Sequence, residues 1–299
     1  MTKSIFVTGA TGLVGKNTVD ELLRQGYHVT GLARSDASEK ALKDNGCEVI
    51  RGDLKDIEAL KKGAAESDGV IHLGFVHNFA DFETCALIDR AAIDAMLSAL
   101  KGTDRPFISI GGTLGVSEGD GKPNDEDSPY VDLPGFGLRF ETERRVLAYA
   151  SKGVRTISLR LPPTVHGKGD VNGFIPILIA AAEKAGYSFY IPESKNVWSA
   201  VNVEDCASLL VLALKKGKAG KAYHAVGEPG VPLKVIGEAI GRKHNLPTKS
   251  ISYEEAKKLL GFFTDMTLLG ETSLSEKTQK ELGWKPTHAT LVEDIAEFY

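Results

Sequence analysis

The feature that most constrains this chain is a run of glycines directly after its first apolar segment. Residues 4–8 read Ser-Ile-Phe-Val-Thr, which is typical of a buried strand, and residues 9–15 read Gly-Ala-Thr-Gly-Leu-Val-Gly. An amphipathic stretch follows, as expected of a helix. In a strand, loop and helix of this kind, Gly9 permits the tight turn, Gly12 lets the backbone approach a pyrophosphate, and Gly15 lets the helix pack closely on the strand.

The glycine loop therefore predicts a βαβ unit that binds a dinucleotide. Backbone N–H groups at the start of the helix would face the negatively charged pyrophosphate. The residues expected to contact the cofactor in this loop are Gly9, Thr11, Gly12, Leu13, Val14 and Gly15.

Apolar runs alternate with helical patterns through the first half of the chain. The runs lie at 28–33, 48–51, 70–73, 106–110 and 156–161, and the helical patterns between them lie at 57–64, 84–100 and 138–152. This alternation predicts an α/β fold, a Rossmann doubly wound parallel sheet with helices on both faces, spanning residues 1–161.

After residue 161 the pattern changes to helices with short isolated strands. Helices are expected near 171–185, 203–215 and 233–244, and a strand is expected near 222–225. Residues 162–299 are thus expected to form a smaller, mostly helical C-terminal substrate lobe that contributes some elements back to the Rossmann domain. Because ligands of α/β sheets bind at the carboxyl ends of the strands, this lobe would close over a bound cofactor.

Charge and composition narrow the class of partner. The formal net charge is −4 and the basic residues are dispersed, which argues against nucleic acid and favours a small molecule. No apolar run approaches the roughly 18 residues of a membrane span, and the early first strand leaves no room for a signal peptide, so a cytoplasmic location is expected. Cys47, Cys85 and Cys206 lack metal-ligand spacing, which predicts buried free thiols and no metal site.

The residues after the second predicted strand indicate which dinucleotide binds. An NAD-specific site usually has an acid there to bind the adenosine ribose, whereas this chain has Arg34 and Ser35. The guanidinium of Arg34 suits a 2′-phosphate and Ser35 adds a hydroxyl, so NADP(H) is the expected cofactor. Two alternatives stay open, namely that Arg34 is an ordinary surface charge and that Asp36 reaches the ribose.

Further segments resemble the extended and atypical branches of the short-chain dehydrogenase/reductase family, the epimerase/dehydratase-like group, along essentially the whole chain. The segments are Gly52-Asp53-Leu54, His72-Leu73-Gly74-Phe75, residues 160–167 (Arg-Leu-Pro-Pro-Thr-Val-His-Gly) and residues 198–205 (Trp-Ser-Ala-Val-Asn-Val-Glu-Asp). The resemblance implies that Asp53 contacts the adenine and that residues 160–167 border the nicotinamide. Other cofactor contacts that it implies are Leu54, Leu73, Gly74, Pro162 and Val165.

The catalytic Tyr-x-x-x-Lys of that family is missing from the start of the helix expected at 138–152. Aligning the helix on Glu143 places Arg139 at the lysine position and Gly135 at the tyrosine position, and a register shifted by one places Phe136 and Phe140 there. In the family, the tyrosine donates a proton as hydride arrives, and the lysine holds the nicotinamide ribose. Arg139 can supply charge and ribose hydrogen bonds, but its pKa above about 12 excludes proton donation at neutral pH. Pairing with Glu143 at i, i+4 is the structural alternative.

Three residues are candidates to assist the chemistry in place of the tyrosine. Thr113 falls where the family holds its catalytic serine or threonine and is the first candidate for polarising a carbonyl, although it can equally cap a turn. His166 lies on the nicotinamide side in the resemblance and, with an ordinary pKa of about 6.5, can act as an acid. Tyr130, in the loop before the helix, is the third. The predicted catalytic set is therefore Thr113, Arg139 and His166, with a structural role as the alternative for each.

The leading functional hypothesis is an NADP(H)-dependent oxidoreductase that acts on a small carbonyl or activated double bond with an atypical catalytic centre. Loss of a general acid costs about 10²- to 10⁴-fold, which slows hydride transfer without abolishing it. The alternative is a catalytically weak or silent NADP-binding sensor, and the third hypothesis is a nucleotide-sugar epimerase or dehydratase. The resemblance also implies a homodimer through helices 84–100 and 138–152.

Overall fold

A seven-stranded parallel sheet forms the centre of the molecule. A computed structural model of the chain describes residues 2–77, 81–117, 121–131, 136–191, 197–270 and 272–299. The strand order across the sheet is β10-β6-β5-β4-β1-β2-β3, and each neighbouring pair is parallel. The strands are β1 (Ser4–Thr8), β2 (His28–Ala33), β3 (Glu48–Arg51), β4 (Gly69–His72), β5 (Pro106–Gly112), β6 (Arg155–Leu161) and β10 (Lys221–His224). The strand order reverses at β1 and β4, which is where open α/β sheets bind their ligands.

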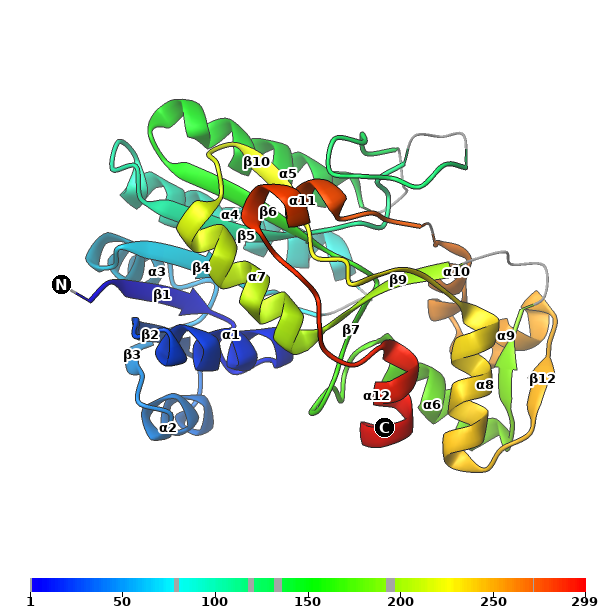
Figure 1. Cartoon of the computed structure of the whole chain (residues 1–299). Coiled ribbons are helices and arrows are strands. Elements are labelled where there is room, and N and C mark those ends of the chain that lie inside the picture. Colours follow the sequence, from blue (N-terminus) through cyan, green and yellow to red (C-terminus); the bar gives the residue numbers. More distant parts are fainter. Residues whose placement is uncertain (1, 78–80, 118–120, 132–135, 192–196, 271) are drawn as a thin grey trace.

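Helices cover both faces of this sheet (Figure 1). The helices α1 (Leu13–Arg24) and α7 (Val203–Lys216) lie beside each other on one face. The opposite face carries α3 (Ile57–Glu66), α4 (Phe82–Leu100) and α5 (Gly137–Ala148), the last extended by a 3-10 turn at Tyr149–Lys152. The short α2 (Asp36–Asp44) packs against β2 and β3. The predicted Rossmann fold is confirmed.

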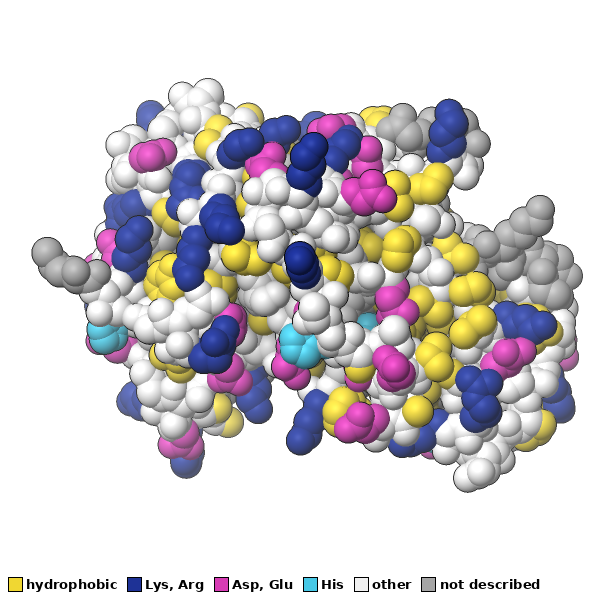
Figure 2. Space-filling model, viewed as in Figure 1, with side chains coloured by type: hydrophobic (Ala, Val, Ile, Leu, Met, Phe, Trp, Pro, Cys, Tyr) yellow, Lys and Arg dark blue, Asp and Glu magenta, His cyan; other side chains and the backbone are white. Residues whose placement is uncertain are grey.

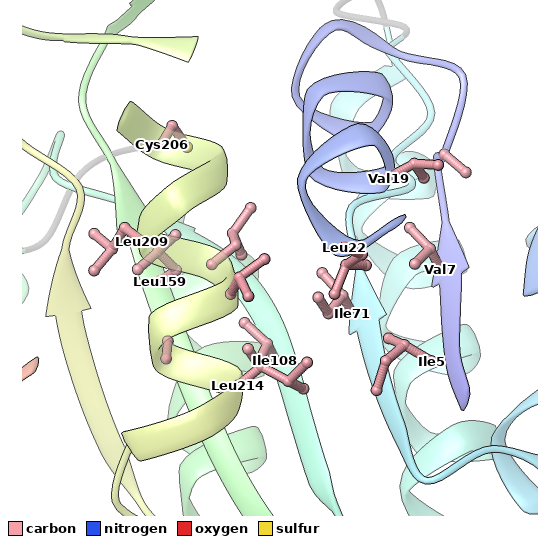
Figure 3. Close-up of a cluster of buried hydrophobic side chains, with 14 of the residues drawn as sticks. Ile5, Val7, Val19, Leu22, Ile71, Ile108, Leu159, Cys206, Leu209 and Leu214 are labelled. Atoms are coloured by element: carbon pink, nitrogen blue, oxygen red, sulfur yellow. The ribbon is translucent and has the colours of Figure 1, made fainter. Parts of the chain in front are cut away.

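Successive side chains of the strands pack alternately into two apolar clusters, one on each face of the sheet. Ile5 and Val7 enter the cluster beneath α1 and α7, which Figure 3 shows, whereas Phe6 enters the cluster beneath α3 and α4. Successive strand residues point to opposite faces of a sheet, so a strand covered on both sides must be apolar throughout. Leu22 of α1 and Leu214 of α7 complete the first cluster from the helix side.

The second half of the chain forms a lobe beside the carboxyl edge of the sheet and also returns to the sheet (Figure 1). Its β10 pairs with β6, with Tyr223 opposite Leu159. The lobe contains a three-stranded sheet in the order β11-β9-β7 and a two-stranded sheet of β12 and β8. Its remaining strands are β7 (Thr164–His166), β8 (Ser188–Tyr190), β9 (Val197–Asn202), β11 (Glu228–Pro232) and β12 (Thr248–Ser250). Its helices besides α7 are α6 (Phe174–Ala185), α8 (Leu233–His244), α9 (Tyr253–Leu260), α10 (Phe263–Leu268), α11 (Glu276–Leu282) and α12 (Leu291–Phe298).

The side chains of the described residues bear on three sequence-based expectations. Cys47, Cys85 and Cys206 are buried and none of the three forms a disulfide, as predicted. None of the helices in the described ranges is both long and apolar enough to cross a membrane. The same residues contain no group of three or more histidine, cysteine or acidic side chains that could hold a metal ion. On the face seen in Figure 2, lysine and arginine are interspersed with aspartate and glutamate.

Candidate functional site

The carboxyl ends of the central strands bring the predicted site residues to one edge of the sheet. β1 and β4 end side by side, with Thr8 opposite His72. β5 and β6 end together in the same way, with Gly112 opposite Leu161. The glycine loop, the turn after β4, Thr113 and Pro162 follow directly on these four strand ends, so the sheet itself determines their grouping.

The glycine loop has the compact geometry that its spacing predicts. Gly9 has a φ of 66°, which is unfavourable for a residue with a side chain, and its carbonyl accepts from the Gly12 N–H at 3.0 Å. A Cβ on Gly15 would lie 2.0 Å from the Gly9 carbonyl oxygen, so only glycine fits where α1 crosses β1. A Cβ on Gly9 would lie 2.6 Å from the Gly74 nitrogen, so the turn after β4 packs directly on this loop.

Gly12 differs from these two glycines because the protein itself leaves room for a side chain there. The nearest atom to a Cβ on Gly12 would be the Gly9 oxygen at 3.4 Å, an ordinary contact distance. Gly12 is also the N-cap of α1, and among the described residues no side chain caps the N–H groups that open this helix. A helix N-terminus with exposed N–H groups attracts an anion. The loop therefore fits a pyrophosphate lying over Gly12.

Two arginines lie where the adenosine end of a dinucleotide is expected. Arg34 is exposed at the end of β2, and Ser35 caps α2 by accepting from the Ser38 N–H at 3.2 Å. Arg51 stands at the end of β3, opposite Ala33 at the end of β2. Sequence reasoning missed Arg51, because its proximity to Arg34 follows from strand register, and a predicted order of β2 beside β3 would have been the only signal.

The structure turns Asp36 toward Arg51. The Asp36 carboxylate lies 2.7 Å from Nη2 of Arg51, and Glu39 lies 3.0 Å from Nη1 of the same guanidinium. Asp36 is nevertheless highly exposed, so this ion pair is weak and open to exchange with a ligand phosphate. Two cations and two acids thus share this corner of the site.

The other predicted adenosine contacts lie around the same strand ends. Asp53 is exposed and accepts from the Lys55 N–H at 2.7 Å. A Cβ on Gly74 would lie 3.0 Å from the Leu54 side chain, so Leu54 lies against the turn that contains Leu73 and Gly74. The structure therefore brings Leu54, Leu73 and Gly74 next to the glycine loop.

Arg139 is anchored where β5 ends. Its Nη1 donates to Oδ2 of Asp89 in α4 at 2.9 Å, its Nη2 donates to the Ile110 carbonyl at 3.1 Å, and its guanidinium lies 4.5 Å from the centre of the Phe75 ring. The side chain remains 23% exposed, so these contacts do not enclose it completely. The alternative expectation that Arg139 pairs with Glu143 is wrong, because its ion-pair partner is Asp89.

Glu143 belongs to a separate buried cluster. It accepts from Nη2 of Arg160 at 2.8 Å and from the hydroxyl of Tyr130. The Tyr130 ring stacks on Phe140 with the centroids 4.1 Å apart. Burial, together with the Glu143 carboxylate, raises the pKa of Tyr130 well above its usual range. Phe140, which the shifted register places at the family's lysine position, is therefore a packing residue. Gly135, which the first register places at the tyrosine position, lies outside the described residues.

Three further predicted site residues, Thr113, Pro162 and Val165, are buried or packed near the ends of β5 and β6. Thr113 is 2% exposed, and its N–H donates to the Leu161 carbonyl at 2.9 Å, which ties the end of β5 to the end of β6. Pro162 is buried directly after β6, and Val165 packs against the cluster beneath α7.

His166 lies inside the lobe. It is 0% exposed, and its Nδ1 lies 2.5 Å from Oδ2 of Asp294 in α12, a carboxylate that also accepts from Asn202 at 3.0 Å. The strand that contains His166, β7, pairs with β9, with His166 opposite Asn202. The sequence did not predict this contact, because Asp294 lies 128 positions after His166. A side chain so enclosed is in no position to give a proton to a substrate in this structure.

A buried histidine near the Glu143 cluster gives the fold a pH-dependent component. Nδ1 of His224 lies 2.9 Å from the Leu274 carbonyl, and Nε2 lies 3.4 Å from Nη1 of Arg160. Burial, followed by the Arg160 charge, lowers the pKa of His224 to about 4, although Asp125 acts in the opposite direction. The folded state therefore keeps this ring neutral at pH values where the unfolded chain protonates it.

Stability is accordingly expected to fall as the pH drops from about 6.5 toward 4. Between pH 7 and pH 5, the His224 contribution to the free energy of unfolding should fall by about 2 kcal/mol, since the unfolded state binds more protons there. Urea unfolding at both pH values would measure this for the natural chain and for His224→Gln, in which the loss should shrink by that amount. His28→Gln, at an exposed histidine, is the matched control. Equal pH dependence in the natural chain and His224→Gln would contradict the assignment.

The sequence is similar to a known protein family and to several known proteins. A model of the NAD dependent epimerase/dehydratase family matches residues 5–226. An uncharacterized protein of Saccharomyces cerevisiae is 46% identical over 99% of this chain and 98% of its own length, and one of Schizosaccharomyces pombe is 44% identical over 98% of each. A 4-hydroxy-2-methyl-3-oxo-4-farnesyl-3,4-dihydroquinoline-1-oxide ketoreductase of Stigmatella aurantiaca is 25% identical over 77% of this chain and 70% of its own.

Solved structures share the fold over nearly the whole chain. The UDP-glucose 4-epimerase of Thermus thermophilus, a complex with NAD, has a TM-score of 0.77 at 19% identity and covers 98% of this chain and 96% of its own. At that identity, the likeness establishes the architecture of the two-lobed molecule and its sheet.

Proposed function

Because the chain belongs to the NAD dependent epimerase/dehydratase family, we propose that it is an NADP(H)-dependent oxidoreductase that reduces a small carbonyl or an activated double bond. The observation that carries the proposal is the combination of a glycine loop open over Gly12 with a fixed cation, Arg139, at the end of β5. A ketoreductase among the relatives in this family supports the reaction class.

In this proposal, Arg139 replaces the lysine of the family. NADPH, when bound, supplies a hydride to the substrate. Arg139 binds the nicotinamide ribose and stabilises the negative charge that develops on the substrate oxygen, as preorganised donors do in other enzymes. Thr113 lies at the same strand ends but is 2% exposed, so in this scheme it holds the ends of β5 and β6 together and leaves the substrate oxygen to Arg139.

Water is the proposed proton source. The Tyr130 hydroxyl already donates to Glu143, and its raised pKa makes it a weak acid. His166 is enclosed by the lobe and takes no part in this scheme. Without a positioned general acid, turnover is expected to be modest, since such an acid contributes about 10²- to 10⁴-fold.

The preference for NADP(H) rests on the corner formed by Arg34 and Arg51. Both guanidiniums follow neighbouring strand ends, and Asp36, the acid that would otherwise bind a ribose, pairs with Arg51. A 2′-phosphate would be held by charge-assisted hydrogen bonds from these two arginines.

Replacing Arg34 by alanine is expected to weaken NADPH binding about tenfold or more, because one charge-assisted contact to the 2′-phosphate is lost, and to leave NADH binding unchanged. Nicotinamide fluorescence during titration with each dinucleotide would measure both affinities. Lys40→Ala, which removes an exposed cation of α2 paired with Asp44, is the matched control. Equal affinity of the natural chain for NADPH and NADH would show the assignment to be wrong.

Oxidation of NADPH by a panel of aldehydes, ketones, quinones and enones tests the reaction itself. Measurable turnover with any class supports a reductase. NADPH binding with no oxidation across the panel would favour the sensor hypothesis, and tight binding of UDP- or dTDP-sugars would favour an epimerase or dehydratase.

A further inference from the structure

A chain of buried hydrogen bonds runs from the turn after β4 into α4. The Gly74 N–H donates to Oγ1 of Thr8 at 3.1 Å, and the same oxygen lies 2.7 Å from Nδ1 of His72. On the other side of the ring, Nε2 of His72 lies 3.0 Å from Oδ1 of Asp89. Thr8, His72 and Asp89 are at most 3% exposed, so these bonds are made away from water, where polar interactions are strong.

Asp89 joins this chain to Arg139. One carboxylate oxygen accepts from His72, and the other accepts from Nη1 of Arg139. The Ile110 carbonyl holds Nη2, and the Phe75 ring covers the guanidinium at 4.5 Å. Arginine loses more side-chain entropy than most residues when it is ordered, and these contacts order Arg139 before any ligand arrives.

The carboxylate also fixes the protonation pattern along the chain. An ionised carboxylate only accepts, so Nε2 of His72 carries a proton and donates it to Asp89. When that ring is neutral, its Nδ1 accepts from the Thr8 hydroxyl, which itself accepts from Gly74. Each link has a donor facing an acceptor, so the arrangement is self-consistent from the β4 turn to Arg139.

We propose that Asp89 is the positioning residue of Arg139, and that Thr8 and His72 connect this pair to the turn that packs on the glycine loop. The inference rests on the proposed function, in which Arg139 contacts the nicotinamide end of the dinucleotide. Because Gly74 packs against Gly9, this series of contacts fixes the position of Arg139 relative to the glycine loop.

A second pair across the same two helices provides a matched control. Asp94 of α4 and Arg145 of α5 form an ion pair at 2.6 Å, but their side chains are 32% and 50% exposed, against 4% and 23% for Asp89 and Arg139. An exposed pair contributes little, so Asp94→Asn removes the same charge from the same helix without disturbing the buried chain.

The test is a double-mutant cycle in binding affinity. NADPH and adenosine 2′,5′-bisphosphate, which lacks the nicotinamide half, are titrated into the natural chain, Asp89→Asn, Arg139→Ala and the double variant. Asp89→Asn is expected to weaken NADPH binding about tenfold in the natural background and less than about twofold in the Arg139→Ala background, because its effect passes through Arg139. Adenosine 2′,5′-bisphosphate binding should change less than about twofold, as should every value for Asp94→Asn.

The outcomes separate the two proposals. If the natural chain binds NADPH but Asp89→Asn has no effect, or loses the same affinity in both backgrounds or for both ligands, Asp89 is not a positioning residue and the proposed function stands. If the natural chain does not bind NADPH, the proposed function fails and this inference fails with it. Circular dichroism establishes that each variant is folded. If Asp89→Asn does not fold, His72→Gln, which removes the ring that holds Asp89, should give a smaller loss with the same dependence on Arg139.

Discussion

Gly12→Ala is expected to leave the chain folded and to weaken NADPH binding about 100-fold, equivalent to about 2.8 kcal/mol. A Cβ there has ordinary clearance within the protein, with its nearest neighbour at 3.4 Å, and an alanine N-cap costs only about 1 kcal/mol. The added methyl group would instead occupy the space through which the pyrophosphate approaches the N–H groups of α1. Titration with NADPH and thermal unfolding of the same samples would measure both effects.

Two other glycines make this test specific. Gly227 has the same clearance of 3.4 Å, to the Pro286 side chain, and lies away from the glycine loop, so Gly227→Ala should preserve NADPH affinity. Gly15→Ala should destabilise the fold itself, since its Cβ would lie 2.0 Å from the Gly9 oxygen. Unchanged NADPH affinity in a folded Gly12→Ala variant would refute the placement of the pyrophosphate.

Arg139→Ala is expected to lower kcat for NADPH oxidation about 100-fold or more, which is the scale of removing one preorganised donor from a developing oxyanion. Arg139→Lys should restore part of the rate, because the ammonium keeps the positive charge. The recovery should be incomplete, because the ammonium cannot contact Asp89 and the Ile110 carbonyl with the geometry of the guanidinium. Steady-state kinetics with the best substrate of the carbonyl panel would measure kcat and KM separately.

Arg144 provides the comparison for that experiment, because it is an exposed arginine of the same helix. Arg144→Ala should keep the natural kcat. If Arg139→Ala turned over at the natural rate, the reaction would not depend on this cation, and the substitution of arginine for the family's lysine would have to be explained by folding alone.

The parts of the fold that could be predicted are those governed by local pattern. The bounds predicted for β1, β2 and β3 are the bounds observed, since each is a short run of strand-forming residues that lies between glycine or polar turns. The strands β7, β8 and β12 escape detection because three residues are too few to show a period. β11 is hidden for another reason, since it contains Pro229 and Pro232, which usually argue against a strand.

The candidate site divides in the same way. The tight turn at Gly9 and the close crossing at Gly15 follow from neighbouring residues, so their geometry could be anticipated. The partners of charged side chains could not, because they come from other elements. A local rule paired Arg139 with Glu143, yet Asp89 takes its place from α4, fifty positions earlier in the chain.

The return of β10 to the edge of β6 has a consequence for how this protein is made. During synthesis, β6 leaves the ribosome well before β10, and until then it presents a row of unpaired N–H and C=O groups. The face of the sheet that α7 later covers is likewise open, with its apolar side chains exposed. Completion of the nucleotide-binding sheet therefore waits for residues encoded in the second half of the gene, and the sequence offers no cut point between two self-sufficient halves.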